Sequence, residues 1–239
     1  MNADHESAPR SQDTADAAPD FDRLADVYRW MEWGSFGPFL GLCRSTFLPR
    51  LSNCHNALVL GDGDGRFTAR LLRDNAHIRV HAIDASTAML GVLTRACSSN
   101  ANRLNAELAD LRTWQPNPAP TPIYDLVVTH FFLDCLSTHE AIALVQRIRP
   151  IVVPGALWVV SEFAVPVGWF GNLVAEPILH CLYLAFGLLT GLRARKLPDY
   201  ASALSAAGFT RLERRPRLGG LLVSELWEAT GRAVGRSRG

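Results

Sequence analysis

From residue 57 onward, short apolar runs alternate with stretches in which apolar residues recur every three or four positions. The apolar runs have the length of buried strands, and they predict strands over residues 57–60, 78–84, 105–109, 124–132 and 156–163. The stretches between them have helical spacing and predict helices over residues 65–74, over 86–97 with Ser86 as N-cap, and over THEAIALVQRIRP, ending near Pro150. This alternation predicts a parallel sheet covered by helices on both faces.

The two ends of the chain depart from this alternation. Near the N-terminus, helical spacing predicts one helix over residues 21–31 and a second over about 39–47, stopped by Pro49. Near the C-terminus, PDYASALSAAGF predicts a helix that stops at Gly208. RLERRPRL and LLVSELWEA, separated by two glycines, predict a closing antiparallel hairpin. We therefore predict one doubly wound α/β domain with a mostly parallel, seven-stranded sheet and an N-terminal helical cap.

The expected domain limits follow from changes in composition along the 239 residues. Residues 1–20 are rich in Ala, Asp, Ser and Pro, which cannot support a core, so we expect a disordered tail there. The single domain is expected over residues 21–232, with the helical cap at 21–50 and an apolar insert at 164–198, and residues 233–239 form a C-terminal tail.

Composition also narrows the classes of function. The formal net charge of +1 gives no electrostatic footprint for nucleic acid. The five cysteines are an odd number, widely spaced and without a C-x-x-C pair, which argues against a disulfide framework and against a structural zinc site, and we predict no metal. The N-terminal stretch is acidic and lacks the apolar run of a signal peptide, so we expect a cytoplasmic protein.

The stretch LVLGDGDGRF (58–67) places three glycines and two aspartates directly after the first predicted strand of the alternation. In a doubly wound sheet, the ligand binds beyond the carboxyl ends of the strands, and this turn supplies backbone contacts. Gly61, Gly63 and Gly65 remove side chains so that a ligand can approach the main chain, although such turns also occur for geometric reasons alone. Asp84 ends the second strand nineteen residues after Gly65, where an acid can accept both ribose hydroxyls, and Asp110 ends the third strand, placed for an exocyclic amine.

The kind of nucleoside ligand depends on the charges of this glycine corner (residues 61–65). A dinucleotide fingerprint requires glycine at the position that Arg66 occupies, and Asp62 and Asp64 would repel a pyrophosphate. S-adenosylmethionine carries a sulfonium and an ammonium group and has no phosphate. The corner therefore favours an adenosine-containing cation.

Together with AIDASTAML, AELAD, YDLVVTHFFLDCL and PGALWVVSEF, this corner resembles the class I S-adenosylmethionine-dependent methyltransferases, in order and spacing, over about residues 21–227. The resemblance is greatest to members that act on small or lipophilic acceptors. It implies that S-adenosylmethionine is the cofactor and assigns its contacts as follows: Gly61, Gly63 and Gly65 line the methionine moiety, Asp84 holds the ribose, Ala85 and Met89 flank the adenine, Asp110 and Leu111 meet its amine and ring, and Thr129 and His130 lie near the methionine group.

One position departs from the family pattern. Val59 stands where the family usually has an acid, and Asp62 or Asp64 is the expected substitute. Two alternatives to a methyltransferase follow from these residues. Val59 leaves open a non-catalytic scaffold that binds S-adenosylmethionine, whereas a nicotinamide-dependent oxidoreductase is disfavoured by Arg66 and the acids of the corner.

The methyl acceptor is less clearly indicated. Strand four ends in THFF, where family members acting on amides and nucleobase amines carry an Asn/Asp-Pro-Pro-aromatic signature, so we favour O- or C-methylation over N-methylation. Methyl transfer needs alignment and desolvation, and it needs a base only if the acceptor must lose a proton. The candidate bases are His130, Glu162 and His180, and a structural, hydrogen-bonded role is the alternative for each histidine.

Residues 177–192, PILHCLYLAFGLLTGL, contain no charged side chain, and three basic residues follow within 193–196. The segment is too short for a comfortable membrane span. It is either a helix packed on the sheet or a lid over an apolar acceptor pocket, with peripheral membrane contact through 177–196. Trp30, Trp33 and Phe36 are candidates for the opposite wall of that pocket or for the core. We therefore predict transfer of a methyl group to a small, apolar acceptor.

Overall fold

The computed structural model of the chain describes residues 38–116, 123–166, 168 and 197–230. The predicted helix at 21–31, its neighbouring aromatic residues Trp30, Trp33 and Phe36, the segment 177–196 with His180, and both predicted tails lie outside the described residues.

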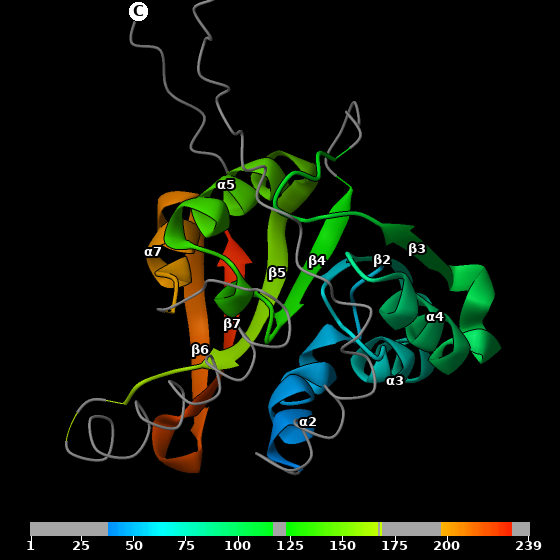
Figure 1. The fold of residues 1–239 in the computed structure, drawn as a ribbon, viewed down its shortest axis with the longest axis horizontal. Coiled ribbons are helices and arrows are strands. Elements are labelled where there is room, and N and C mark those ends of the chain that lie inside the picture. Colours follow the sequence, from blue (N-terminus) through cyan, green and yellow to red (C-terminus); the bar gives the residue numbers. More distant parts are fainter. Residues whose placement is uncertain (1–37, 117–122, 167, 169–196, 231–239) are drawn as a thin grey trace, which may run out of the picture.

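The described residues form a seven-stranded sheet with the order β3-β2-β1-β4-β5-β7-β6 (Figure 1). The five parallel strands are β1 (Asn56–Leu60), β2 (Arg79–Asp84), β3 (Leu104–Leu108), β4 (Tyr124–His130) and β5 (Val152–Phe163). At the other end of the sheet, β6 (Phe209–Arg217) and β7 (Leu222–Ala229) form an antiparallel hairpin in which β7 pairs with β5. The predicted mixed sheet with a closing hairpin is confirmed.

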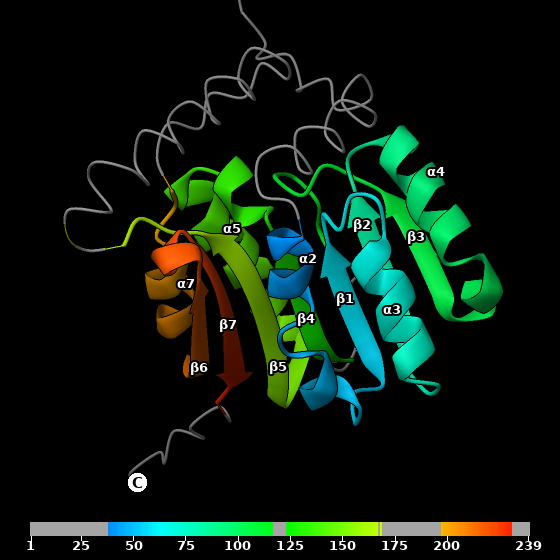
Figure 2. The same ribbon diagram turned by 90° about the horizontal axis from the view of Figure 1, so that it is seen from below.

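Helices cover both faces of the sheet (Figure 2). They are α2 (Phe39–Arg44), α3 (Arg66–Asp74), α4 (Thr87–Ala96), α5 (Thr138–Ile148) and α7 (Tyr200–Ala206). Leu71 of α3 and Leu93 of α4 belong to the core on one face, and Leu144 of α5 and Leu204 of α7 belong to the core on the other. Strand β1 is buried on both faces because its alternate side chains enter the two cores in turn, which explains its continuous apolar run.

The predicted helix at 39–47 was wrong in its extent and in its stop signal. Helix α2 ends at Arg44, where the hydroxyls of Ser45 and Thr46 donate to the carbonyls of Gly41 and Leu42 at 2.5 and 2.9 Å. Pro49 lies within the following 3-10 turn, Leu48–Leu51, and does not end α2.

Strand β4 is two residues shorter than predicted. It ends at His130 because Phe131 adopts a left-handed backbone conformation, with φ of 52°. Two other local predictions are confirmed: the Ser86 side chain accepts a hydrogen bond from the Met89 amide at the start of α4, and Gly208 adopts φ of 82° just after α7.

Candidate functional site

The glycine corner lies at the carboxyl end of β1, between β2 and β4, where the strand order of the sheet reverses. All three glycines have left-handed backbones, with φ of 65°, 60° and 73° for Gly61, Gly63 and Gly65. A Cβ atom on Gly61 would lie 2.6 Å from the Phe132 ring, and one on Gly65 would lie 2.7 Å from Cα of Leu93. A Cβ atom on Gly63 would meet nothing within 4 Å. Packing therefore requires Gly61 and Gly65 to be glycine, and only Gly63 presents bare backbone to open space.

The two aspartates of the corner are engaged by the protein itself. Asp62 is buried, and its Oδ2 accepts hydrogen bonds from the amide and hydroxyl of Thr68 at 2.9 and 2.6 Å. It thereby caps the first turn of α3, and burial raises its pKa to about 6. Asp64 forms an ion pair with Arg66 at 2.5 Å. Arg66 therefore compensates the charge of Asp64, and Asp62 is buried, which weakens the electrostatic argument made from the sequence against a pyrophosphate.

The acids that follow β2 and β3 differ in what holds them. One oxygen of Asp84 accepts from the amide of Ser86 at 3.0 Å, and the Ala109 amide donates to the Asp84 carbonyl at 3.0 Å, which ties the ends of the two strands together. Both oxygens of Asp110 accept from the backbone and guanidinium of Arg112, at 2.6 to 3.0 Å, and this hydrogen bonding lowers the pKa of Asp110 below its usual range. The Asp110 carboxylate is thus already supplied with donors.

The three remaining residues assigned to adenine lie beside these acids. Ala85 is exposed, while Met89 and Leu111 are buried. Ala85 follows β2, Met89 lies in the first turn of α4, and Leu111 follows β3. All three therefore lie at the same edge of the sheet as Asp84.

The end of β4 contributes two buried polar side chains that point to opposite faces. Thr129 is fully buried, and its hydroxyl accepts from the indole N–H of Trp158 at 3.1 Å. The His130 ring packs edge-on against Phe67 at 4.5 Å, and neither ring nitrogen has a hydrogen-bond partner among the described residues. Burial, reinforced by the nearby Arg44, holds the pKa of His130 well below its usual range, so its imidazole is neutral at pH 7.

Arg44 is a residue of this site that the sequence did not single out. It projects from α2, is buried, and lies 5.4 Å from the ring centroid of Phe131. It is near enough to Asp62 and His130 to affect the pKa of each. A lone arginine in the apolar helix FLGLCR was the only signal in the sequence.

Glu162 is buried on β5, and its Oε1 accepts hydrogen bonds from the amides of Phe132 and Leu133 at 3.1 and 2.8 Å. Burial, together with the nearby carboxyl of Asp134, raises the pKa of Glu162 well above its usual range. Of the three candidate bases, the structure therefore brings His130 and Glu162 to the same end of the sheet, and His180 lies outside the described residues.

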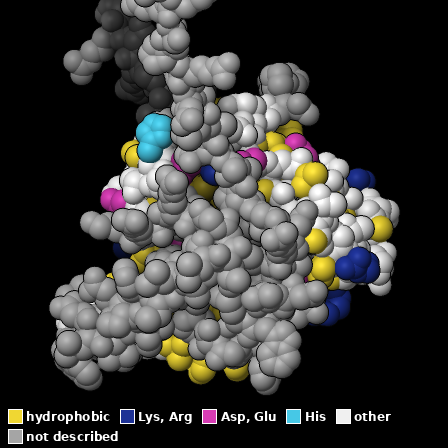
Figure 3. All heavy atoms as spheres, in the orientation of Figure 1, with side chains coloured by type: hydrophobic (Ala, Val, Ile, Leu, Met, Phe, Trp, Pro, Cys, Tyr) yellow, Lys and Arg dark blue, Asp and Glu magenta, His cyan; other side chains and the backbone are white. Residues whose placement is uncertain are grey.

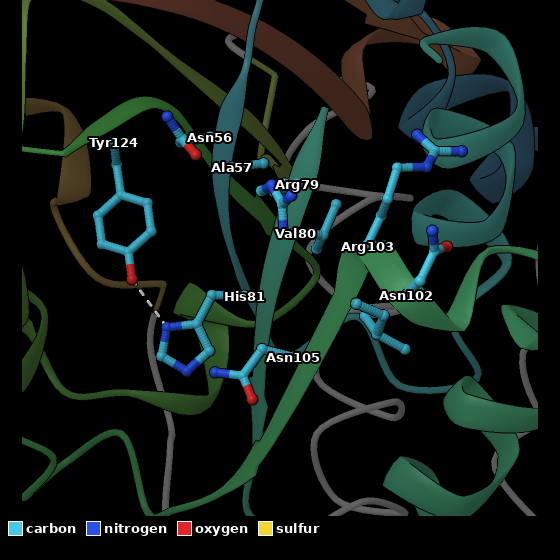
Figure 4. A pocket seen from close by; sticks show the side chains of 10 residues that line it. Asn56, Ala57, Arg79, Val80, His81, Asn102, Arg103, Asn105 and Tyr124 are labelled. Atoms are coloured by element: carbon cyan, nitrogen blue, oxygen red, sulfur yellow. Dashed lines mark hydrogen bonds between the residues drawn. The ribbon is translucent and has the colours of Figure 1, made fainter. Parts of the chain in front are cut away.

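A separate polar cluster lies toward the opposite ends of the strands, around a hollow of about 220 Å³ (Figure 4). The Tyr124 hydroxyl and His81 Nδ1 are 2.8 Å apart, and His81 Nε2 lies 2.8 Å from Glu107. The other Glu107 oxygen accepts from Trp114 at 3.0 Å. These groups satisfy one another, so the cluster is structural.

The surface adds little that bears on partners. On the face shown in Figure 3, charged side chains of the described residues are interspersed with hydrophobic and neutral ones. None of the helices in the described ranges is long and apolar enough to span a membrane.

Residues 57–155 match the family model described as "Methyltransferase domain". A search of curated proteins found no match. Among solved structures, similar folds include an O-methyltransferase family protein from Burkholderia thailandensis (TM-score 0.67, 13% identity, 87% of this chain and 60% of that one) and the methyltransferase SibL (TM-score 0.61, 21% identity, 90% and 63%). The N-methyltransferase NodS from Bradyrhizobium japonicum WM9, in complex with S-adenosyl-L-homocysteine, is covered completely (TM-score 0.60, 15% identity, 88% of this chain).

The TM-scores show a shared fold, and at such low sequence identities the similarity extends to the fold alone. This chain spans about 60% of the length of the Burkholderia protein. Residues 57–155 are thus similar to a methyltransferase domain, in agreement with the resemblance to class I S-adenosylmethionine-dependent methyltransferases that the sequence indicated. S-adenosylmethionine is the cofactor of this class, in agreement with the prediction.

Proposed function

We propose that this protein is an S-adenosylmethionine-dependent methyltransferase that acts on a small molecule and binds its methyl donor at the carboxyl edge of β1, β2 and β4. The observation that carries the proposal is the open backbone of Gly63 at the point where the strand order reverses, at the same edge of the sheet as Asp84. Residues 57–155, which include both, match a methyltransferase family model. The proteins of similar fold include both O- and N-methyltransferases, so the reacting atom of the acceptor is argued from the residues of this chain.

The residues present fit the cofactor. Asp84 accepts the ribose hydroxyls, Ala85 and Met89 flank the adenine, and Leu111 meets the ring. Asp110 lies at the position assigned to the adenine amine, but Arg112 already supplies its carboxylate with donors, so its contribution to affinity is small.

The methionine moiety of the cofactor carries an ammonium, a carboxylate and a sulfonium. Asp62 and His130 each have a buried atom without a partner among the described residues, and such atoms suit a polar ligand group. Arg44, buried beside both, supplies the positive charge for the carboxylate. Gly63 and the backbone of the corner face the rest of this moiety.

The bound cofactor supplies a methyl group made electrophilic by its sulfonium. The protein aligns the acceptor and excludes water. Neither described candidate base is placed for proton transfer: the His130 ring is buried with its pKa held well below the usual range, and Oε1 of Glu162 already accepts from two backbone amides. An acceptor that ionises readily by itself, such as an acidic hydroxyl or an enol, fits this site best. This preference and the THFF sequence support O- or C-methylation of a small, apolar acceptor.

Two measurements test the proposal. Calorimetry is expected to show binding of S-adenosylhomocysteine and none of NADH; NADH binding without S-adenosylhomocysteine binding would overturn it. Transfer of a labelled methyl group to a panel of phenols, enols and amines of matched size then identifies the acceptor. Cofactor binding without transfer to any acceptor would favour the non-catalytic scaffold.

A further inference from the structure

The backbone just after β4 follows an unusual course. His130 is the last strand residue, and Phe131 then adopts a left-handed conformation that a non-glycine residue seldom takes. The Phe131 amide still donates to the Ser161 carbonyl of β5, at 2.7 Å, but the chain then leaves the sheet and enters the 3-10 turn Leu133–Cys135. The next two amides, of Phe132 and Leu133, therefore have no carbonyl on β5 to bind.

A side chain takes the place of that missing carbonyl. Oε1 of Glu162 accepts from both amides, at 3.1 and 2.8 Å, across a sequence separation of about thirty residues. Glu162 is 1% exposed, so water cannot replace it without opening the core. The Leu133 amide is buried and the Phe132 amide is partly buried, so leaving them without an acceptor would cost free energy, and the turn therefore depends on the length of the Glu162 side chain.

This turn also sets the position of the Phe132 ring at the glycine corner. The Phe132 side chain lies against Gly61, so closely that a Cβ atom on the glycine would overlap it. The Gly61 amide is held from the other side by the Ile83 carbonyl of β2, at 2.9 Å. The first glycine is therefore clamped between β2 and the turn that Glu162 holds.

We propose that Glu162 is a positioning residue for methyl-donor binding: its side chain fixes the turn Phe131–Cys135, and through Phe132 the glycine corner, and it takes no part in proton transfer. This inference rests on the proposed function. It replaces the role of general base that the sequence offered for Glu162, because Oε1 serves the backbone, and Oε2, which has no partner among the described residues, is enclosed in the core.

Two conservative variants of Glu162 separate the effect of side-chain length from the effect of the ionisable carboxyl group. Glu162→Gln keeps an acceptor oxygen at the same distance but removes acid–base chemistry, and Glu162→Asp keeps the carboxyl but shortens its reach by one methylene. A positioning role predicts that Gln preserves S-adenosylhomocysteine affinity within about threefold, whereas Asp and Ala each weaken it by about tenfold or more, with one factor of ten equal to about 1.4 kcal/mol.

Hydrogen exchange of the Phe132 and Leu133 amides provides a readout independent of the ligand. Both amides are expected to be protected in the wild type and in Glu162→Gln, and to exchange at least about tenfold faster in Glu162→Asp. If Glu162→Ala fails to fold, the comparison of the Asp and Gln variants still tests the positioning role. Glu225→Ala is the matched control, because Glu225 is another buried carboxylate, paired with Arg211 and Arg214 of the neighbouring strand β6. It should lower the melting temperature and leave cofactor affinity unchanged.

Three outcomes would overturn the inference. Loss of methyl transfer in Glu162→Gln with wild-type affinity and amide protection would make Glu162 an acid–base group. Unchanged affinity and protection in Glu162→Asp would show that the turn does not depend on its reach. Equal losses of affinity in Glu162→Ala and the Glu225 control would show that the weaker binding follows from lower stability alone. If the wild type itself does not bind S-adenosylhomocysteine, the proposed function fails, while amide exchange still reports on the turn.

Discussion

Substituting alanine for single glycines of the corner should separate its ligand-facing part from its packing part. Gly63 and Gly65 share a left-handed backbone, with φ of 60° and 73°, so alanine at either site carries the same conformational cost of about 1–2 kcal/mol. They differ in their surroundings. The new methyl group at 63 meets nothing within 4 Å, and the one at 65 lies 2.7 Å from backbone Cα of Leu93, which cannot rotate away.

The overlap at Gly65 adds an overpacking cost of about 1–3 kcal/mol to the backbone strain. We therefore expect Gly65→Ala to lower the free energy of unfolding by roughly 2–5 kcal/mol and Gly63→Ala by only about 1–2 kcal/mol. Among folded variants, the order of the two effects is reversed for cofactor binding, and the substitution at 63 costs more affinity than the one at 65. The methyl group at 63 occupies the space that we assign to the cofactor, so Gly63→Ala should weaken S-adenosylhomocysteine binding by about tenfold or more.

Urea denaturation measures the free energy of unfolding, and calorimetry measures the affinity for S-adenosylhomocysteine. Gly91→Ala is a suitable control, since Gly91 lies within α4 and its nearest neighbour would be the flexible end of Arg95, at 3.6 Å. Equal stability losses at 63 and 65 would refute the packing argument. Unchanged cofactor affinity in Gly63→Ala would refute the placement of the ligand against the open backbone.

Two further predictions concern the acids. Asp84→Ala should weaken S-adenosylhomocysteine binding by roughly 1.5–3 kcal/mol, about tenfold to a hundredfold, whereas Asp110→Ala should weaken it less than about tenfold because Arg112 already occupies that carboxylate; equal losses in calorimetry would contradict this order. The raised pKa of Asp62, about 6 against 3.8, means that the folded state holds this proton more tightly, so wild-type stability falls as pH rises from about 4 to about 6. Asp62→Asn should remove this loss, and its unfolding free energy relative to wild type should improve by up to roughly 3 kcal/mol over that range; a flat difference in urea denaturation from pH 4 to 7 would count against it.

Much of the fold could be predicted from the sequence because its signals are local. The four-residue apolar run at 57–60 became β1, buried on both faces, and helices with a 3.6-residue period became α3, α4 and α5. Ser86 and Gly208 marked a helix start and a helix end by chemistry that depends only on neighbouring backbone. The predicted stop at Pro49 failed because Ser45 and Thr46 end α2 earlier, and proline is compatible with the first turn of a 3-10 helix.

The site was predictable in position but not in the pairing of its side chains. The order of strands and glycines placed Gly63 and Asp84 at one edge of the sheet, since the carboxyl ends of parallel strands meet there. Composition could not show that Arg112 holds Asp110, or that Asp62 caps α3 while facing Arg44.

The tertiary structure alone decided which distant residues meet. Glu162 and the amide of Phe132 are thirty residues apart in sequence, and Tyr124 and His81 are forty-three apart. The first pairing depends on the register of β4 and β5 and on the left-handed turn at Phe131. The second depends on the registers that align β2 and β4 on either side of β1, and no local pattern connects either pair. Periodicity encodes the face on which a side chain lies, and only the packed sheet fixes what stands opposite it.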